Sequence, residues 1–385
     1  MAHYRSVGDV PPKRHTRGGL YYEELMGEEG FSGDSSLLYH RGIPSALSDA
    51  RPWTPPGGPT RPNLPLLPRH LRPHELFGSD DWREADAVTG RRVLLVNADV
   101  RICYAVAGSP SPLFRDAVGD ECCYVESGSG TLETVFGALP FRQGDYVIVP
   151  RGTAHRWVPE GGQPVRLYCV ESSGHIAPAR RYLTQSGQFL EDAPYCERDL
   201  RAPTSPLLIE EPGPVELLVK HRSPHGLDGT SYLLPHHPFD VVAWDGCLYP
   251  YTLNIADFEP STGRVDRPPP THLVFESTGF IIGNSTPRKP DSHPQPTPMP
   301  YYHSNVDSDE VTFYYGDHPA PHPSGITQGS LSLHPSGHTH APHPTPHEHS
   351  TNTPQTITIN TSHPLSLGEA AFPCQAPAYP WTHLP

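Results

Sequence analysis

One pattern of fixed residues occurs twice in this chain, at 144–155 and again at 329–340. Each copy reads Gly, five residues, Pro, one residue, Gly, two residues and His. Pro and Gly at these offsets are typical of a turn between two strands. Because both copies follow strand-rich stretches, the repeat predicts a duplicated β-barrel.

Short runs rich in β-branched and aromatic residues surround both copies. The first series extends over 93–170 and the second over 249–360, with turn residues between the runs. Their spacing is the one expected of β-sandwiches and barrels. The 50 prolines argue against long helices, and no segment shows a sustained helical period. We therefore expect an all-β protein.

The repeated motif resembles the second signature motif of the cupin superfamily, whose barrel is a double-stranded β-helix or jelly roll. This resemblance implies two cupin barrels preceded by an N-terminal arm. We expect the arm at 1–70, the first barrel at 71–210 and the second barrel at 211–385, with the join in the loop-rich stretch 204–238. The arm is polar and rich in Pro and Gly, with one expected strand at 31–39. We interpret it as an ordered arm over the core, and a partly mobile tail is the alternative.

Upstream of the second copy, His303 and Glu310 lie on two adjoining predicted strands. Together with His340 they offer two imidazoles and one carboxylate. This set is the facial triad that holds non-haem Fe(II) and leaves coordination positions open. Open positions are what an oxygenase needs, because substrate and O2 must meet at the metal.

The first copy differs at one decisive position. Aligning Glu121 with Glu310 places Phe114 where the second copy has His303. Glu121 and His155 remain, but an apolar ring replaces the third ligand. We therefore expect a first barrel without metal, in which His155 makes an ordinary hydrogen bond to the backbone.

Histidine is abundant in this chain, with 24 copies, many in His-Pro steps between 290 and 350. The simple interpretation of most of them is a solvated loop residue, or together a nonspecific metal-chelating tract. For Glu310 the simple alternative is an ordinary acid at the end of a strand. His303 and His340 differ because positions in a motif select them, which a chelating tract would not explain. The loop histidines are His318, His322, His343, His347 and His349.

Composition restricts the setting and the partners. The formal charge of −14 disfavours nucleic acid and anionic membranes as partners. Seven cysteines without a CxxC pair are too few for a disulfide framework, which favours a reduced compartment. The N-terminus lacks the apolar core of a signal peptide, and no run of 18 apolar residues follows. We expect a cytoplasmic protein.

In its motifs and their flanks, the chain resembles the homogentisate 1,2-dioxygenase family over most of its length. The matching segments are Tyr301–Asn305 leading to Glu310, Ser332–His334 leading to His340, Gly128–Thr134, Glu24–Gly27, Phe31–Gly33 and Asp240–Gly246. The family's reaction converts homogentisate and O2 to 4-maleylacetoacetate in tyrosine and phenylalanine breakdown. The resemblance implies that His303, Glu310 and His340 bind iron.

The resemblance also implies roles for other residues. Tyr301 and His334 fall where the family contacts its substrate. The family has a His acid/base before the metal motif, for which His272 is the best match and Arg267 a competitor. The family is oligomeric, which together with the arm predicts a homo-oligomer.

Some features depart from this family. The spacing from His303 to Glu310 is one residue longer, the chain is shorter, and 350–385 matches poorly. No counterpart is found for the basic residue near the substrate carboxylate. Three alternatives stay open: a cupin dioxygenase for gentisate or a related dihydroxy aromatic acid, a cupin isomerase with Zn or Mn, and a noncatalytic binding or storage bicupin.

Overall fold

The computed structural model describes residues 3–13, 21–78, 80–259, 272–286, 302–316, 325–340 and 355–381. In these residues the regular structure consists of strands and short 3₁₀ helices, without an α-helix, so the all-β prediction is confirmed. The 3₁₀ helices are η1 (Glu29–Phe31), η2 (Pro73–Leu76), η3 (Asp81–Arg83), η4 (Arg180–Tyr182), η5 (Ile255–Asp257), η6 (Glu369–Ala371) and η7 (Tyr379–Trp381).

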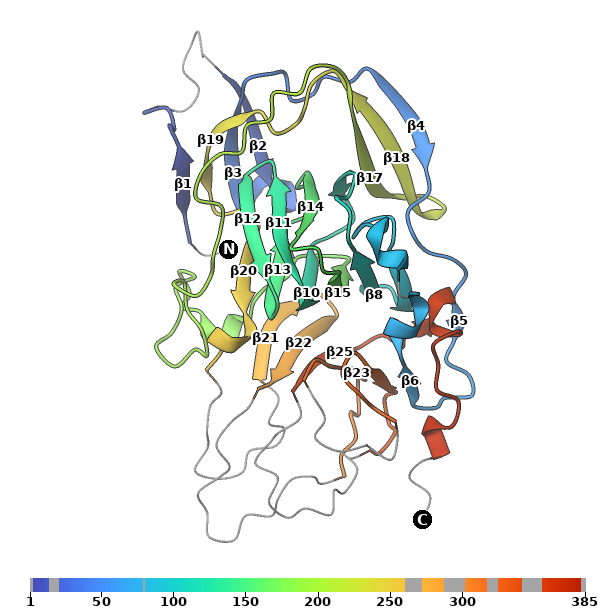
Figure 1. Cartoon of the computed structure of the whole chain (residues 1–385). Helices are drawn as coiled ribbons and strands as arrows, with labels where there is room; N and C mark the ends of the chain where they lie inside the picture. Colours follow the sequence, from blue (N-terminus) through green and yellow to red (C-terminus); the bar gives the residue numbers. More distant parts are fainter. Residues whose placement is uncertain are drawn as a thin grey trace.

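The first barrel is formed by two sheets (Figure 1). The eight-stranded sheet has the order β20 (Tyr251–Asn254), β13 (Asp145–Val149), β10 (Glu121–Ser127), β15 (Val165–Ser172), β8 (Val100–Ala107), β7 (Arg92–Val96), β26 (Ser366–Leu367) and β5 (Arg61–Pro62). The seven-stranded sheet has the order β12 (Gly137–Arg142), β11 (Ser129–Thr134), β14 (His155–Glu160), β9 (Leu113–Asp116), β17 (Val215–Ser223), β18 (Gly226–Leu234) and β4 (Asp49–Trp53).

The central strands of the eight-stranded sheet are buried on both faces. Successive side chains of a strand point to opposite faces, so neighbours in sequence enter different cores. Cys123 packs inside the first barrel with Phe114 and Trp157, whereas Tyr124 belongs to a separate core on the outer face. This explains why these strands read as continuous apolar runs rather than as an alternation.

The second barrel contributes another seven-stranded sheet. Its order is β16 (Ala177–Pro178), β21 (His272–Ser277), β22 (Phe280–Ser285), β25 (Thr356–Thr361), β23 (Asp309–Tyr314), β24 (Leu331–His334) and β6 (Arg69–Leu71). This sheet lies against the outer face of the eight-stranded sheet, where the rings of Tyr168 and Phe313 stack with centroids 4.4 Å apart and planes inclined by 4°. One continuous core therefore joins the two barrels.

The two faces of the second-barrel sheet differ in chemistry. The Ser-Leu-Ser-Leu and Thr-Ile-Thr-Ile alternations send Leu331, Leu333, Ile357 and Ile359 into the core shared with the first barrel. The alternate residues carry hydroxyls, and these include Ser330, Ser332, Thr312 and Thr358, all buried. The interior of the second barrel is therefore polar, whereas the interior of the first contains a large apolar cluster of Val, Leu, Phe, Trp and Cys.

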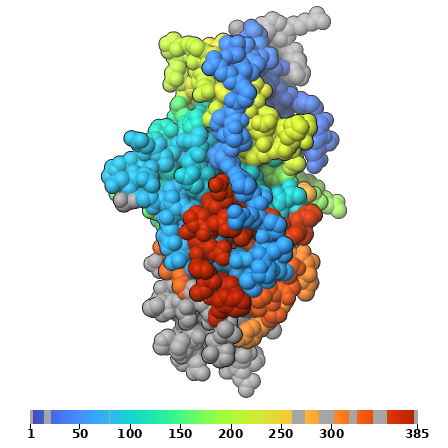
Figure 2. All heavy atoms as spheres, turned by 90° about the vertical axis from the view of Figure 1, so that its right-hand side faces the viewer, coloured from blue at the N-terminus to red at the C-terminus, as the bar shows by residue number. Residues whose placement is uncertain are grey.

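The N-terminal arm is ordered on its own chain in its described residues. It forms a four-stranded sheet in the order β1 (Arg5–Gly8), β19 (Val241–Gly246), β3 (Ser35–His40) and β2 (Tyr22–Gly27). The strand expected at 31–39 is thus present as β3, which begins four residues later, after η1. Further along, the arm descends beside the C-terminal segment on one face of the molecule (Figure 2), where β5 pairs with β26.

Strands from both sides of the predicted boundary between 210 and 211 share the same sheets. After this boundary, β17, β18 and β20 complete the sheets of the first barrel. Before it, β6 and β16 complete the sheet of the second barrel. Segments distant in sequence therefore extend the sheets of each barrel at their edges.

Candidate metal centre

The glycines of the repeated motif have the same conformation in both copies. Gly144 and Gly329 have φ of 87° and 78°, and Gly152 and Gly337 have φ of 85° and 76°. This left-handed region is accessible to Gly without steric cost, which explains why the motif fixes Gly at these positions. The turns direct the chain back so that the last His of each copy reaches its barrel.

His303 and His340 are brought together by the backbone. The N–H of His303 donates to the carbonyl of His340 at 2.8 Å, and the N–H of His340 donates to the carbonyl of His303 at 2.9 Å. This isolated antiparallel bridge holds the two imidazoles on neighbouring segments, with ring centroids 4.2 Å apart. The third residue, Glu310, lies on β23 directly opposite His334 on β24.

The structure brings the predicted triad into a single cluster. One ligand atom from each of His303, Glu310 and His340 lies within 4.8 Å of the other two. His340 Nε2 is 3.5 Å from Glu310 Oε1. His340 is buried, and Glu310 is 16% exposed. The cluster sits on the polar interior face of the second barrel.

Neighbouring groups orient these side chains. His340 Nδ1 lies 3.1 Å from the carbonyl of His338, a contact in which Nδ1–H donates and Nε2 keeps its lone pair. Asn305 Nδ2 donates to Glu310 Oε2 at 2.8 Å, which leaves Oε1 facing His340. Burial alone would raise the pKa of Glu310, but the neighbouring His340 and the hydrogen bond from Asn305 outweigh it and lower the pKa to about 2. Glu310 is therefore an anion at neutral pH.

His334 lies directly against the cluster. Its ring stacks on that of His340, with centroids 4.0 Å apart and planes inclined by 4°. His334 Nε2 is 3.0 Å from the hydroxyl of Tyr379, which comes from the C-terminal segment. Burial, reinforced by the neighbouring His340, lowers the pKa of His334 to about 3. His334 is thus a neutral imidazole beside the candidate metal position.

Comparisons with known proteins show to which family the chain is related. The Cupin domain family matches residues 101–171. A Saccharolobus solfataricus protein named "Putative dioxygenase SSO1533" is 32% identical over 393 residues, which is 99% of this chain and 98% of that protein. The chain therefore belongs to the same family of cupins as the Saccharolobus solfataricus protein.

More distant relatives of this cupin carry a more specific name. Homogentisate 1,2-dioxygenase from Nitrobacter hamburgensis is 29% identical over 69% of this chain and 59% of its own length. The Emericella nidulans protein of the same name is 28% identical over 82% of this chain and 68% of its own length. A solved structure, the Cupin 2 conserved barrel domain protein from Leptotrichia buccalis, aligns with 78% of this chain at 11% identity and a TM-score of 0.30.

The first barrel of this cupin repeats the backbone arrangement of the second. Phe114 pairs with His155, as His303 pairs with His340, and Glu121 lies opposite Val149, as Glu310 lies opposite His334. Phe114 therefore occupies in the first barrel the position that His303 occupies in the second, as the alignment of the two copies predicted. His155 is fully buried, and its Nδ1 lies 3.0 Å from the carbonyl of Thr153.

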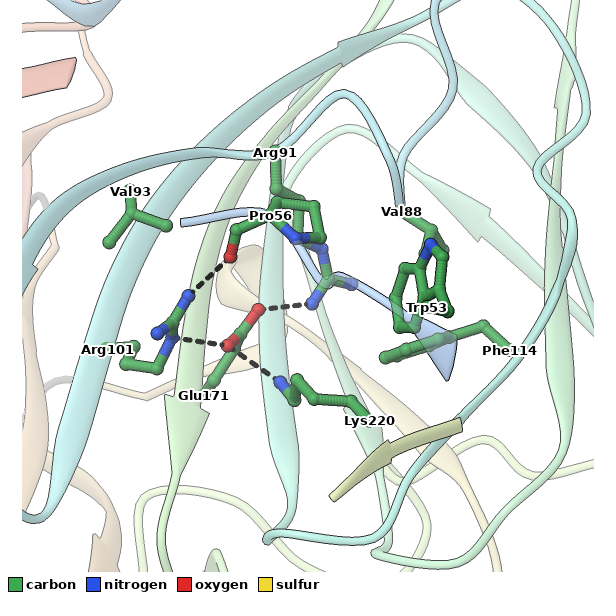
Figure 3. A pocket seen from close by; sticks show the side chains of 9 residues that line it. All are labelled: Trp53, Pro56, Val88, Arg91, Val93, Arg101, Phe114, Glu171 and Lys220. Carbon is green, nitrogen blue, oxygen red and sulfur yellow. Dashed lines mark hydrogen bonds and ion pairs between the residues drawn. The ribbon is translucent and has the colours of Figure 1, made fainter. Parts of the chain in front are cut away.

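Cationic side chains surround the carboxylate of the first barrel. Arg91 donates two hydrogen bonds to Glu121, at 2.7 Å and 3.0 Å, and one to Glu171 at 2.7 Å. Lys220 donates to Glu171 at 2.8 Å and pairs with Asp116. Figure 3 shows Arg91, Arg101 and Lys220 converging on Glu171. Burial alone would raise the pKa of Glu121, but the Arg91 charge outweighs it and holds the pKa below its usual range.

The space that remains in this part of the first barrel is small. The cavity among Trp53, Arg91, Phe114 and Lys220 measures about 10 Å³, enough for roughly one water molecule. An aromatic substrate could not enter it.

Tyr301 and the competing Arg267 lie outside the described residues. The backbone of His272 begins β21 and pairs with Asn284 on β22. The sequence predicted no role for Asn305, His338 or Tyr379. Tyr379 reaches His334 over 45 positions, which no local pattern encodes. The contact of His338 with His340 is local and repeats that of Thr153 with His155 in the first copy of the motif.

The described residues contain no helix long and apolar enough to cross a membrane.

Proposed function

We propose that this cupin is an Fe(II)- and O2-dependent dioxygenase that opens the ring of a dihydroxy aromatic acid. The proposed substrate is homogentisate and the product 4-maleylacetoacetate, in tyrosine and phenylalanine breakdown. The observation that carries the proposal is the meeting of His303, Glu310 and His340 on the polar interior of the second barrel. Relatives named dioxygenases, which align with up to 99% of the chain, support the oxygenase class.

The residues present fit an iron site. Two imidazoles and one carboxylate are the donor set of mononuclear non-haem Fe(II) oxygenases. His340 Nε2 is buried and makes no directed hydrogen bond within the described part of the chain, although Glu310 lies 3.5 Å away. A lone pair held there without a donor is what a metal ligand requires. When bound, Fe(II) would supply the redox chemistry between O2 and an electron-rich ring.

The chain's own residues would bind, orient and deprotonate the substrate. His272 is the proposed base for a substrate hydroxyl, because an unperturbed His has a pKa of about 6.5 and is available in its neutral form. Tyr301 and His334 are the proposed substrate contacts. Buried hydroxyls such as that of Ser332 continue the polar surface around the site.

The first barrel is proposed to be structural and without metal. Both oxygens of Glu121 accept hydrogen bonds from Arg91, so the carboxylate is already neutralised by a buried guanidinium. Phe114 removes the third ligand, and its ring lies edge-on to His155 with centroids 5.5 Å apart.

Oxygen consumption by the Fe(II)-reconstituted protein tests the proposal. Homogentisate should support O2 uptake, and gentisate should support little. The control variant Glu310→Gln keeps the size of the side chain and should support none. Uptake with gentisate alone would replace the proposed substrate by the alternative dihydroxy acid.

The same preparation separates the other classes of function. A Zn- or Mn-dependent isomerase would convert its substrate anaerobically and consume no O2. A noncatalytic bicupin would bind ligand without turnover. Absence of O2 uptake across a panel of dihydroxy aromatic acids, with iron bound, would overturn the dioxygenase proposal.

A further inference from the structure

A second group of metal-ligating side chains lies where the N-terminal arm meets the first barrel. Glu28 follows β2 in the arm, Asp120 precedes β10, and His175 follows β15. One ligand atom from each lies within 4.8 Å of the other two. We propose that these three residues bind a divalent transition cation of the Zn²⁺ type, which fastens the arm to the first barrel.

The distances around His175 are close to those that a shared cation would require. Its Nδ1 lies 3.0 Å from Glu28 Oε1 and 3.8 Å from Asp120 Oδ1. Zinc bonds of about 2.0–2.2 Å at tetrahedral angles would place ligand atoms about 3.3–3.6 Å apart. The two observed distances lie on either side of this interval, so a cation could enter with small side-chain movements.

His40, a histidine of the arm, shows the geometry of an ion pair that involves no metal. The two ring nitrogens of His40 face separate carboxylates, with Nδ1 2.7 Å from Asp240 and Nε2 2.9 Å from Glu24. This is the arrangement of a doubly protonated imidazole, which has two donors. His40 therefore acts as a hydrogen-bonded clamp.

His175 instead turns a single nitrogen toward both carboxylates. Its Nδ1 is buried and makes no directed hydrogen bond within the described part of the chain. His340 Nε2 in the candidate iron site has the same property beside Glu310. A single nitrogen that faces two carboxylate oxygens is the arrangement in which one cation can contact all three ligand atoms.

The ligands are held in place before any cation binds. Asp120 is 3% exposed, and its two oxygens accept hydrogen bonds from the backbone N–H groups of Arg151 and Ile176, both at 2.8 Å. The carbonyl of Glu28 accepts from the N–H groups of Phe31 and Gly33, which fixes the turn after β2. Ligands on such supported segments lose little freedom on binding.

The charge balance also favours a cation. Among the described residues, neither Glu28 nor Asp120 makes an ion pair with Lys or Arg. The carboxylates of Asp120 and Glu28 raise the pKa of His175 to about 10, so a divalent cation would displace the ring proton on binding and balance the two negative charges. His175 is 27% exposed, so solvent reaches the cluster and water could complete the coordination.

Zinc binding by the full chain tests this site separately from the proposed function. The parent protein for this experiment carries His340→Ala, so that zinc bound in the second barrel is not counted. A chelator first removes all bound metal from it. After dialysis against Zn²⁺, adding His175→Ala should lower the bound zinc by about one equivalent per chain. Adding His225→Ala should lower it by none, because His225 is exposed at the turn between β17 and β18.

The comparison between variants matters because the chain has 24 histidines, some of which can hold zinc nonspecifically. A second measurement covers the case in which His175→Ala fails to fold. Zn²⁺ should raise the Tm of the parent protein and leave that of its Glu28→Gln variant unchanged, since a ligand that binds the native state stabilises it. Equal zinc contents in the His175 and His225 variants, or a zinc-induced Tm shift that survives Glu28→Gln, would overturn the site.

Discussion

The three proposed iron ligands are each indispensable at the scale of single residues. We expect His303→Ala, Glu310→Ala and His340→Ala to lose iron and O2 uptake while the barrels stay folded, because removal of one ligand leaves only two. Elemental analysis and circular dichroism measure the two properties. The matched control is His155→Ala at the same motif position of the first barrel, which should retain iron and most activity.

Equal iron content in wild type and in all three variants would contradict the triad. Loss of iron from His155→Ala would show instead that the first barrel binds metal.

The proposed acid/base makes a different prediction. His272→Phe should keep iron bound and slow turnover by roughly 10²–10⁴-fold, the usual contribution of a general acid or base. The variant should be compared with wild type at saturating substrate, with iron content measured on the same sample. Unchanged turnover would remove His272 from the reaction and direct attention to Arg267 or His334.

At the scale of elements, the ion network inside the first barrel should contribute strongly to stability. Arg91→Met leaves Glu121 without its main partner, and an uncompensated buried charge costs about 3–5 kcal/mol. Urea unfolding measures the loss. The control Arg51→Ala removes a surface pair with Asp49 and should cost less than about 1 kcal/mol. Similar losses of unfolding free energy in the two variants would show that burial of the ion network adds no stability.

The arm sheet should respond to pH through His40. Burial alone would lower the pKa of His40, but hydrogen bonds to Asp240 and Glu24 outweigh it and raise the pKa to about 9. His236 also lies 3.8 Å from Asp240, and it is the other titratable group at this contact. Because the folded-state pKa is raised, the stabilisation is complete below about pH 6.5 and is lost as the pH rises through about 9.

We therefore expect the free energy of unfolding to fall between pH 7 and 10, and to fall less in His40→Gln. Glutamine keeps the hydrogen-bonding capacity and removes the titration. Parallel pH profiles for the two proteins would contradict the assignment.

At the scale of the whole molecule, we predict a homo-oligomer, at least a dimer. The arm lies on its own chain, but β2 is the last strand of its sheet, and Tyr22 and Leu25 on it are 50% and 49% exposed. An edge strand with exposed apolar side chains can pair with a second copy. Light scattering at micromolar concentration should give at least twice the chain mass, and Leu25→Lys should lower it. A monomeric full-length protein would end the idea.

The sequence alone determined the duplicated barrel and the asymmetry between its two copies. Turn chemistry is local, so Gly and Pro at fixed offsets specify the turn wherever it occurs, and both copies have the expected backbone. The alignment of Phe114 with His303 followed from the same spacing. The residues of the candidate triad were therefore identifiable without coordinates.

Only the tertiary structure decided which groups surround those residues. Arg91 reaches Glu121 over 30 positions, and Tyr379 reaches His334 over 45. Sheet edges completed by distant segments likewise follow no local period, so strands from both sides of residue 210 enter the sheets of each barrel. Such contacts depend on how whole sheets pack, because burying apolar area and covering strand edges are properties of the assembled chain.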